Sequence, residues 1–214
     1  MSAGRLITVE GIDGAGKTTL VGGLGKALAA RGVEVVTLRE PGGVPLSERI
    51  RALLREPSGS DHVDPRAEAL LYAAARAQLT TSRLQPLLQA GTWVLLDRFV
   101  DSSLAYQGGG RGLGVEAIRA VNMFATGGLV PDRTLLLEIS PPAGRVRQRE
   151  RQDTQDRIEG EDDSFFDAVA HTYRQLAGAD RARIRCIDAT EAPDRVLAAA
   201  LEAIADLLPA TTGA

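Results

Sequence analysis

Residues 11–18 read Gly-Ile-Asp-Gly-Ala-Gly-Lys-Thr and match the pattern G-x-x-x-x-G-K-[ST]. In such a loop the glycines let consecutive backbone N–H groups turn toward a phosphate chain, the lysine reaches the β- and γ-phosphates, and the final hydroxyl ligates Mg²⁺. The hydrophobic pattern predicts a strand before the loop and a helix after it, so the positive end of that helix faces the same anion. Lys17 is one of only two lysines among 25 basic residues, which gives its place in the motif more weight. We therefore expect a nucleoside triphosphate to contact Gly11, Ile12, Asp13, Gly14, Ala15, Gly16, Lys17, Thr18 and Thr19.

An acidic residue ends an apolar run further along the chain. Residues 94–96 are Val-Leu-Leu and precede Asp97. Enzymes with this kind of loop place a carboxylate near Mg²⁺ or its waters at such a strand end. Taken alone the pattern is weak, because an acid after an apolar strand is often merely a loop residue. Thr18 and Asp97 are the candidate metal contacts, and that plainer reading stays open.

A triphosphate-binding loop does not say what is done with the nucleotide. Switch GTPases need an N-K-x-D motif that reads guanine, and the lysines at positions 17 and 26 supply none. Motor and transporter ATPases usually bring larger or additional domains. The 214 residues of this chain suit one α/β domain with a substantial core. A small-molecule kinase fits this length better.

Composition argues against several other classes. The net charge is -3, with 25% charged residues, so we expect no general binding to nucleic acid. No apolar run approaches the ~18 residues that span a bilayer, and residues 1–8 lack the layout of a signal peptide. We expect a cytoplasmic protein with no membrane contact. Cys186, the only cysteine, lies in the apolar run 184–187 and should fill the core, whereas His62 and His171 should lie at the surface.

Predicted strands and helices alternate along the sequence. Apolar or β-branched runs predict strands at residues 5–10, 33–38, 92–97, 134–139 and 183–187. The second of these should be buried on both faces, as in parallel sheets. Helical patterns cover residues 17–30, 46–55, 66–90, 115–125 and about 194–208. Pro86 should kink or end the third helix, and residues 108–114 should form a glycine-rich loop. The alternation predicts an α/β fold, with a mainly parallel five-stranded sheet flanked by helices on both faces and ligands beyond the carboxyl ends of the strands.

Five segments resemble, in order, the motifs of the thymidylate kinase family of bacterial type. They are EGIDGAGKTT at residues 10–19, REPGG at 39–43, DRF at 97–99, SSLAYQG at 102–108 and DRIE at 156–159. The motifs cover roughly residues 5 to 190, and five in order are far more specific than any one alone. The resemblance implies a P-loop NTPase fold and a single nucleoside monophosphate kinase domain over residues 1–214. It further implies transfer of the γ-phosphoryl group of ATP to dTMP, with Mg²⁺, and a homodimer formed through the helices at 46–55 and 66–90.

Two side chains on one predicted helix have the chemistry to read a pyrimidine. Tyr72 and Arg76 stand at i and i+4 and so share a face. An aromatic ring beside a guanidinium can stack on the base and donate to its exocyclic oxygen. From the residues alone the plainer reading is an apolar stripe that includes Tyr72 and a solvated Arg76. The resemblance favours the contacts to the base.

The acceptor phosphate needs a cationic partner. Arg98 follows Asp97, so the two side chains leave the strand end in different directions, and a guanidinium fits a phosphate dianion well. The resemblance implies that Arg98 holds the 5′-phosphate of dTMP and that Asp13 lies near the sugar hydroxyl. The full set of dTMP contacts that we expect is Asp13, Glu40, Pro41, Tyr72, Arg76, Arg98, Ser103, Tyr106 and Gln107. For the polar members of this set, simple helix capping is the alternative.

Residues 145–157 contain five arginines, at positions 145, 147, 149, 151 and 157. A charge run usually means a solvated helix. The phosphate-binding loop contains no arginine, however, and part of the family supplies one from a lid. We name Arg149, Arg151 and Arg157 as candidate catalytic residues beside Lys17 and Arg98, within a lid at about residues 143–163 that should be mobile without nucleotide. Glu159, in the DRIE segment, joins the candidate metal contacts.

The expected chemistry needs no strong general base, because the acceptor is a phosphate oxygen that is already anionic near neutral pH. Catalysis should consist of positioning and charge neutralisation. Two rivals stay open. A deoxynucleoside kinase would need a carboxylate base such as Glu40, and a P-loop regulatory ATPase would need no acceptor.

Overall fold

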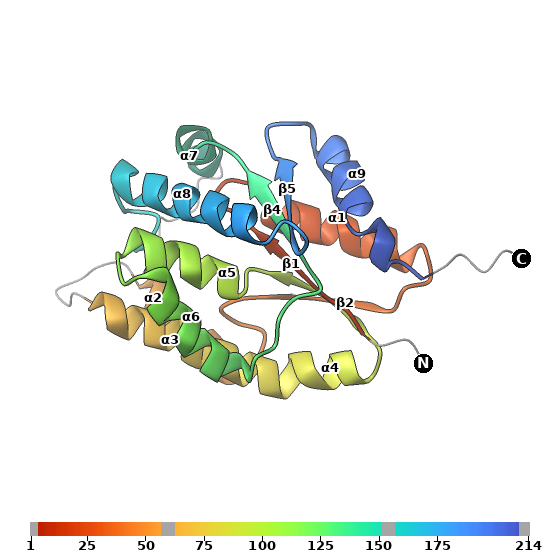
Figure 1. The fold of residues 1–214 in the computed structure, drawn as a ribbon, viewed down its shortest axis with the longest axis horizontal. Coiled ribbons are helices and arrows are strands. Elements are labelled where there is room, and N and C mark those ends of the chain that lie inside the picture. The colour runs from red at the N-terminus through yellow and green to blue at the C-terminus, as the bar shows by residue number, and fades with distance from the viewer. Residues whose placement is uncertain (1–3, 57–62, 151–156, 210–214) are drawn as a thin grey trace, which may run out of the picture.

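The computed structural model describes residues 4–56, 63–150 and 157–209. Five strands form one parallel sheet in the order β2-β3-β1-β4-β5 (Figure 1). Their bounds are β1 Leu6–Glu10, β2 Val35–Arg39, β3 Trp93–Asp97, β4 Arg133–Glu138 and β5 Ile184–Asp188. Since β1 is the central strand, the phosphate-binding loop that follows it opens at the middle of the carboxyl edge of the sheet.

Helices cover both faces of this sheet. On one face α1 (Lys17–Ala29) and α9 (Pro193–Ala203) pack over a buried cluster. The other face carries α3 (Pro65–Leu79), α4 (Gln85–Gln89) and α8 (Asp163–Ala179). α2 (Pro45–Arg55) and α6 (Val115–Thr126) pack on either side of α3, while α5 (Val100–Ser103) and α7 (Pro141–Glu150) follow β3 and β4. The predicted α/β architecture is confirmed, and strand bounds differ from the predicted ones by at most two residues.

The prediction that residues 33–38 are buried on both faces is wrong. Among the described residues β2 is an edge strand that pairs with β3 alone, and its residues are half-buried or exposed. An apolar run of β-branched residues cannot by itself distinguish a central strand from an edge strand, because its position depends on contacts far away in the sequence.

The predicted helix at residues 66–90 is divided. The α-helical part ends at Leu79, a π-helical turn covers Thr80–Leu84, and α4 contains Pro86 at its second position. Proline has no N–H and its ring collides with the carbonyl four residues earlier, so a widened turn before it keeps the chain helical. The interruption expected from Pro86 is therefore present, but it lies in the preceding turn.

The glycine-rich loop predicted at residues 108–114 is confirmed for residues 111–114 only. Residues 108–110 instead belong to the π-helical segment Leu104–Gly110. A Cβ atom on Gly109 would lie 2.1 Å from Thr172 Oγ1 on α8. Here Gly109 serves close packing between two helical segments, which is a second use of glycine that sequence patterns do not separate from turns.

The two longest helices without a predicted counterpart, and one exposed thiol, also differ from the sequence interpretation. The sequence interpretation assigned no element to α7 or α8, although α8 buries Phe165, Phe166 and Tyr173. Cys186 is exposed on the edge strand β5 and does not fill the core, so that prediction is wrong. His171 is exposed as predicted, and His62 lies outside the described residues. None of the described helices is both long and apolar enough to cross a bilayer.

Candidate active site

The loop from β1 to α1 holds Lys17 over its own backbone. The Lys17 ammonium donates to the carbonyl of Gly11 at 3.0 Å and to that of Ile12 at 2.8 Å. Burial, together with the charge of Arg98, lowers the pKa of Lys17 to about 8. A phosphate beside this nitrogen would favour its charged form. Lys17 is thus placed for a phosphate chain by a loop that turns through the left-handed Gly16.

Residue 14, within the phosphate-binding loop, tolerates only glycine. Gly14 has a φ of +82°, and a Cβ atom there would lie 2.1 Å from the carbonyl oxygen of Gly144 on α7. The first turns of α7 therefore pack directly on the phosphate-binding loop. This close approach explains physically why no arginine occupies this position.

Thr18 and Asp97 meet across the carboxyl edge of the sheet. The Thr18 hydroxyl donates to Asp97 Oδ2 at 2.9 Å. A hydroxyl and a carboxylate are hard oxygen donors of the kind that Mg²⁺ prefers, and the metal usually keeps several waters and contacts substrate phosphates as well. No group of three or more His, Cys, Asp or Glu side chains within residues 4–56, 63–150 and 157–209 could hold a metal by itself. The pair thus fits a nucleotide-bound Mg²⁺ and not a metal caged by protein alone.

Arg98 turns inward through an unusual backbone conformation. It has a φ of 70° and is the one non-glycine residue with positive φ in the described chain. Its guanidinium pairs with Asp13, donates to the Gly11 carbonyl at 3.2 Å and lies 5.0 Å from the centre of the Tyr106 ring. Burial alone would raise the pKa of Asp13, but the charges of Arg98 and Lys17 lower it to about 2. Backbone strain of this kind is common at functional sites.

Glu10, the last residue of β1, binds the segment that follows β3. Its carboxylate accepts from the backbone N–H of Phe99 at 2.7 Å, from Ser102 at 2.5 Å and from the Tyr173 hydroxyl at 2.9 Å. Burial and the charge of Asp101 raise the pKa of Glu10 to about 7. Tyr173 was missed in the sequence because α8 was missed.

Arg76 is not solvated, contrary to the plainer reading of its position. It is 2% exposed, and its Nε donates to Glu40 Oε2 at 2.7 Å. Its Nη1 donates to Ser103 Oγ at 2.9 Å and to Asn122 Oδ1, and its Nη2 donates to the carbonyl of Phe99 at 2.9 Å. Burial raises the pKa of Glu40 to about 7, against the lowering effect of Arg76. Asn122, on α6, carried no motif that could have marked it.

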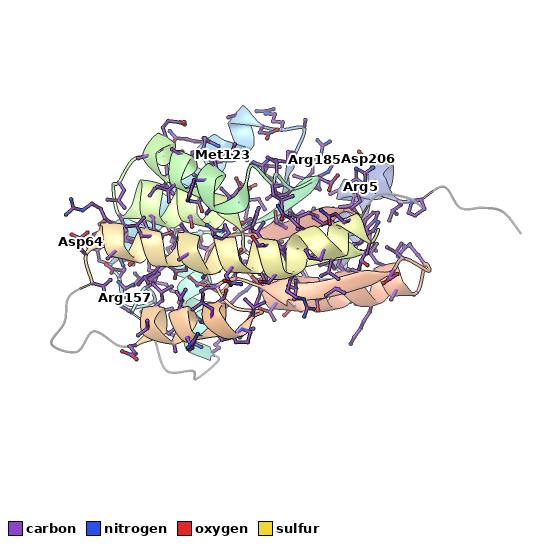
Figure 2. All side chains as sticks on the ribbon, turned by 90° about the horizontal axis from the view of Figure 1, so that it is seen from below. Arg5, Asp64, Met123, Arg157, Arg185 and Asp206 are labelled. Atoms are coloured by element: carbon purple, nitrogen blue, oxygen red, sulfur yellow. The ribbon has the colours of Figure 1, made fainter. Side chains whose placement is uncertain are left out.

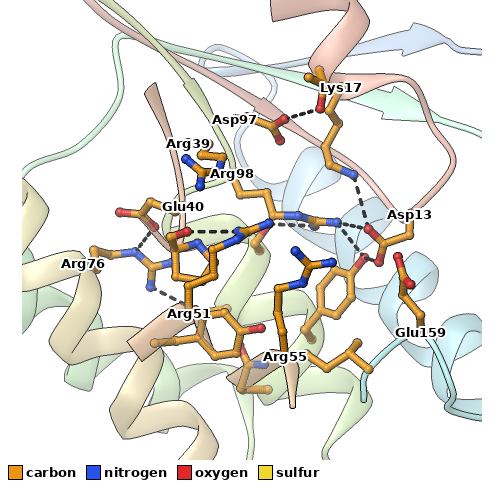
Figure 3. Close-up of a pocket in the computed structure, with 18 of the residues that line it drawn as sticks. Asp13, Lys17, Arg39, Glu40, Arg51, Arg55, Arg76, Asp97, Arg98 and Glu159 are labelled. Carbon is orange, nitrogen blue, oxygen red and sulfur yellow. Dashed lines mark hydrogen bonds and ion pairs between the residues drawn. The ribbon is translucent and has the colours of Figure 1, made fainter. Parts of the chain in front are cut away.

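The structure brings most of the predicted residues into one cavity of about 330 Å³ (Figure 3). The predicted residues that line it are Asp13, Gly14, Gly16, Lys17, Thr18, Glu40, Pro41, Tyr72, Arg76, Asp97, Arg98, Ser103, Tyr106, Gln107 and Glu159. Gly11 and Ile12 instead supply the carbonyls beneath Lys17. One end of this cavity is the phosphate-binding loop, and the other is lined by α2 and α3.

Three further arginines line this cavity and were not named as site residues from the sequence. They are Arg39 at the end of β2, and Arg51 and Arg55 on α2. Arg51 donates to the Pro41 carbonyl at 3.0 Å, and its pKa is lowered by burial and by the charges of Arg39 and Arg55. Arg51 and Arg55 stand at i and i+4, so the spacing that identified Tyr72 and Arg76 could also have identified them.

A second cavity, of about 450 Å³, lies on the other side of the phosphate-binding loop. It is lined by the loop, by α1 from Thr19 to Gly23 and by the segment from Ala189 to Leu197. Arg147 of α7 borders it and donates to the Ala189 carbonyl at 2.7 Å. Ala15 and Thr19, both predicted nucleotide contacts, lie here and not in the first cavity. The two cavities share Gly14 and Gly16, so a triphosphate over the loop could join them.

The arginine cluster is distributed among several protein partners. Arg145 pairs with Asp163 at 3.1 Å and lies over the Phe166 ring, and Arg157 pairs with Glu68 at 2.7 Å. Arg149 is exposed at the end of α7, and Arg151 lies outside the described residues. Arg145 and Arg157 are thus not simply solvated, because each has a carboxylate partner in the protein.

Known proteins resemble this chain over nearly its whole length. The family model described as "Thymidylate kinase" matches residues 9–199. The thymidylate kinase of Rhizorhabdus wittichii is 49% identical over 207 residues, which cover 96% of this chain and 99% of that protein. That of Halorhodospira halophila is 45% identical, with 96% of each chain covered. The crystal structure of thymidylate kinase from Ehrlichia chaffeensis superposes with a TM-score of 0.75 at 30% identity, over 96% of this chain and 99% of that one. The chain therefore belongs to the thymidylate kinase family.

Proposed function

We propose that this protein transfers the γ-phosphoryl group of ATP to dTMP and forms dTDP. One observation carries the proposal: a single cavity is lined at one end by Lys17 and Thr18 and at the other by Tyr72 and Arg76, with Arg98 between them. A donor phosphate over the loop and an acceptor nucleotide in the cavity would meet beside Arg98. Membership of the family supports this assignment.

In the part of the cavity proposed for dTMP, Arg76 has one N–H group available to bind the base. A guanidinium has five N–H groups. In Arg76, Glu40, Ser103, Asn122 and the Phe99 carbonyl take four of them, all inside the core. The remaining N–H on Nη2 can donate to an exocyclic carbonyl of thymine, and Tyr72 lies one helical turn earlier to stack on the ring. Because Arg76 is held from four sides, its position is fixed before substrate binds.

The acceptor phosphate would be neutralised by arginines. Arg98 provides the first guanidinium, and Arg39, Arg51 and Arg55 line the same cavity. No general base is needed for a phosphate acceptor, and these cations instead offset the negative charge of two phosphate groups that approach each other. The charge of Asp13 orients Arg98.

Mg²⁺ would bind between the nucleotide phosphates and the pair formed by Thr18 and Asp97. When bound it neutralises charge on the β- and γ-phosphates. Glu159 lines the same cavity as Lys17 and Arg98, which we call the acceptor cavity, and stays a candidate for contact with the metal or its waters. We also propose that residues 1–214 form one cytoplasmic domain.

The decisive experiment measures ADP release with dTMP, with thymidine and with no acceptor. We expect release with dTMP alone. Release with thymidine would favour a deoxynucleoside kinase that uses Glu40 as base, although Glu40 is already paired with Arg76. Release at the same rate without acceptor would favour a regulatory ATPase. Either result would overturn the proposal.

Base selectivity tests the acceptor end separately. We expect dTMP to be preferred over dUMP, and dUMP over purine monophosphates, because the cavity is bounded by Tyr72 and the fixed Arg76. Tyr72→Ala should raise KM for dTMP much more than KM for ATP. Equal turnover of dGMP and dTMP would contradict this assignment.

A homodimer is the assembly that we propose. Figure 2 shows α2, α3 and α6 side by side on one face, with Met123 on the outer surface of α6. Exposed apolar side chains gather on these helices, namely Leu46, Leu53, Leu70, Met123 and Phe124. Phe124 is 92% exposed, and an apolar group of this kind usually marks an interface. Light scattering should give twice the mass of the chain, and Phe124→Glu should weaken the association. A stable monomer at micromolar concentration would contradict the dimer.

A further inference from the structure

Glu68, on α3, contacts side chains of two other segments close to the acceptor cavity. Its side chain is 0% exposed. Gln107 Nε2 donates to Oε1 at 2.8 Å, Arg111 Nη2 donates to Oε2 at 3.0 Å, and Arg157 Nη1 lies 2.7 Å from Oε2. Burial alone would raise the pKa of Glu68, but the hydrogen bonds of Arg111 and Gln107 hold it below its ordinary value. Glu68 is therefore a buried carboxylate that stays ionised.

Glu68 itself does not line the acceptor cavity, but its partners reach two of the cavity walls. Gln107 lines one wall directly. Arg157 precedes Ile158 and Glu159, which line another wall. Arg157 is 8% exposed, and Figure 2 shows it beside the first half of α3. One carboxylate thus connects α3, the π-helical segment and the turn that begins at Arg157.

The charge of Glu68 also fixes the orientation of the Gln107 amide. An ionised carboxylate only accepts hydrogen bonds, so Gln107 must turn its NH₂ group toward Glu68. The amide oxygen is then the end that faces the cavity. A hydrogen-bond acceptor at this place can bind the N3–H of thymine or uracil, whereas it would be repelled by the N3 lone pair of cytosine.

We propose that Glu68 is a positioning residue of the acceptor site, which fixes the amide of Gln107 and, through Arg157, holds the wall formed by Ile158 and Glu159. The inference rests on the proposed function. It gives Arg157 a different role from the one that the arginine run suggested. Arg157 acts on the acceptor wall through Glu68 and not on the transferred phosphate.

The first experiment compares dTMP and dCMP as acceptors for the wild type and Glu68→Gln. The substituted amide can donate or accept, so it no longer dictates the orientation of Gln107, and the NH₂ group of Gln107 can turn toward cytosine N3. We expect kcat/KM for dTMP to fall about 10- to 100-fold, as for other misplaced binding groups. The ratio of kcat/KM for dTMP to that for dCMP should fall about tenfold. An unchanged ratio would overturn the role of Glu68 in orienting the amide.

The second experiment uses Arg157→Met, which leaves Glu68 with Gln107 and Arg111. We expect KM for dTMP to rise about tenfold while KM for ATP and kcat change by less than about threefold, since only the acceptor wall is released. Arg157→Lys keeps a cation beside Glu68 and should recover most of the dTMP affinity. A fall in kcat of about 10²–10³ with KM for dTMP unchanged would place Arg157 on the transferred phosphate and overturn the inference.

A double variant decides whether Arg157 acts through Glu68. The effect of Glu68→Gln with Arg157→Met should be close to that of Glu68→Gln alone, because the second change removes a partner that the first has already released. Effects that multiply would overturn the link. If Glu68→Gln does not fold, the pattern of KM and kcat in the two Arg157 variants still decides the inference.

Arg133→Met is the matched control. Arg133 is also a buried arginine in an ion pair, with Asp206 at 2.6 Å, but it lies at the start of β4, away from the cavity. Arg133→Met should leave KM for dTMP unchanged. If it raised KM for dTMP as much as Arg157→Met does, the Arg157 effect would be general destabilisation and the inference would be overturned. A wild type without dTMP turnover would instead refute the proposed function itself.

Discussion

The Thr18 hydroxyl donates a hydrogen bond to Asp97 Oδ2 across 2.9 Å and so links the first turn of α1 to the carboxyl end of β3. Asp97 pairs with Val9 across the β1–β3 ladder, which brings it beside the loop that follows β1. The two oxygens therefore have a fixed separation before nucleotide or metal binds. A preorganised pair of this kind costs little reorganisation when the phosphates arrive.

Replacing either oxygen should change the Mg²⁺ dependence of the reaction. We expect Asp97→Asn and Thr18→Val each to lower kcat by about 100-fold and to raise the Mg²⁺ concentration needed for half-maximal activity, because a hard oxygen donor is lost. Activity measured across a Mg²⁺ titration at saturating ATP and dTMP checks this. A variant with the Mg²⁺ profile of the wild type would show that the hydrogen bond is structural only.

Lys17→Ala should abolish phosphoryl transfer while the fold survives. Within the described part of the chain, Lys17 Nζ bonds only to loop carbonyls and an acidic neighbour, so its loss removes a phosphate contact and little packing. We expect turnover to fall by at least about 10²–10³, with a melting temperature within a few degrees of that of the wild type. Coupled ADP-release kinetics and a thermal melt make the comparison. Turnover within a few-fold of the wild type would contradict the role assigned to the loop.

Local motifs predicted which residues share a cavity better than they predicted burial. The sequence named residues of the phosphate-binding loop, Asp97 and Arg98 as site candidates because each belongs to a motif defined by neighbours along the chain, and the structure places Lys17, Asp97 and Arg98 around one cavity. The environment of Arg76 could not be found in this way, because its partners Glu40, Ser103 and Asn122 come from three distant segments. In the same way, nothing local distinguishes the edge strand β2 from a central one.

Glycine-rich segments illustrate the same limit. At Gly14 and at Gly109 the sequence shows only a residue without a side chain. The reason differs in each case: one lies against Gly144 of α7 and the other against Thr172 of α8. Since both helices were missed in the sequence, the packing role of these glycines was missed as well.

Variants of Arg98 and variants of the lid residues Arg149 and Arg151 should differ in their effects on kcat and on KM for dTMP. Arg98 contacts Asp13 and lines the acceptor cavity, so Arg98→Ala should raise KM for dTMP and also lower kcat. Arg149→Ala and Arg151→Ala should lower kcat with little change in KM for dTMP, because these residues would act on the transferred phosphate. Steady-state kinetics on the three variants test this. If both lid variants keep a near-normal kcat, the arginine run is a solvated helix and the lid mechanism is wrong.

Cys186 offers a test of the electrostatics at the β5 edge of the sheet. It is exposed on β5, yet burial of its thiol and the nearby charge of Glu138 raise its pKa from 9.0 to about 11. The thiolate is the reactive form, so at pH 8 its population should be about 100-fold smaller than for a thiol of ordinary pKa. We expect slow alkylation by iodoacetamide at pH 8, with a rate that rises about tenfold per pH unit up to pH 10.

Glu138→Gln should lower the pKa of Cys186 and speed the reaction, whereas Glu202→Gln, which alters a carboxylate lining the same surface cavity, should have little effect. Because the chain has one cysteine, a single rate constant reports on this thiol. A rate that levels off below pH 10 would show that Glu138 and burial do not hold the thiol in its neutral form.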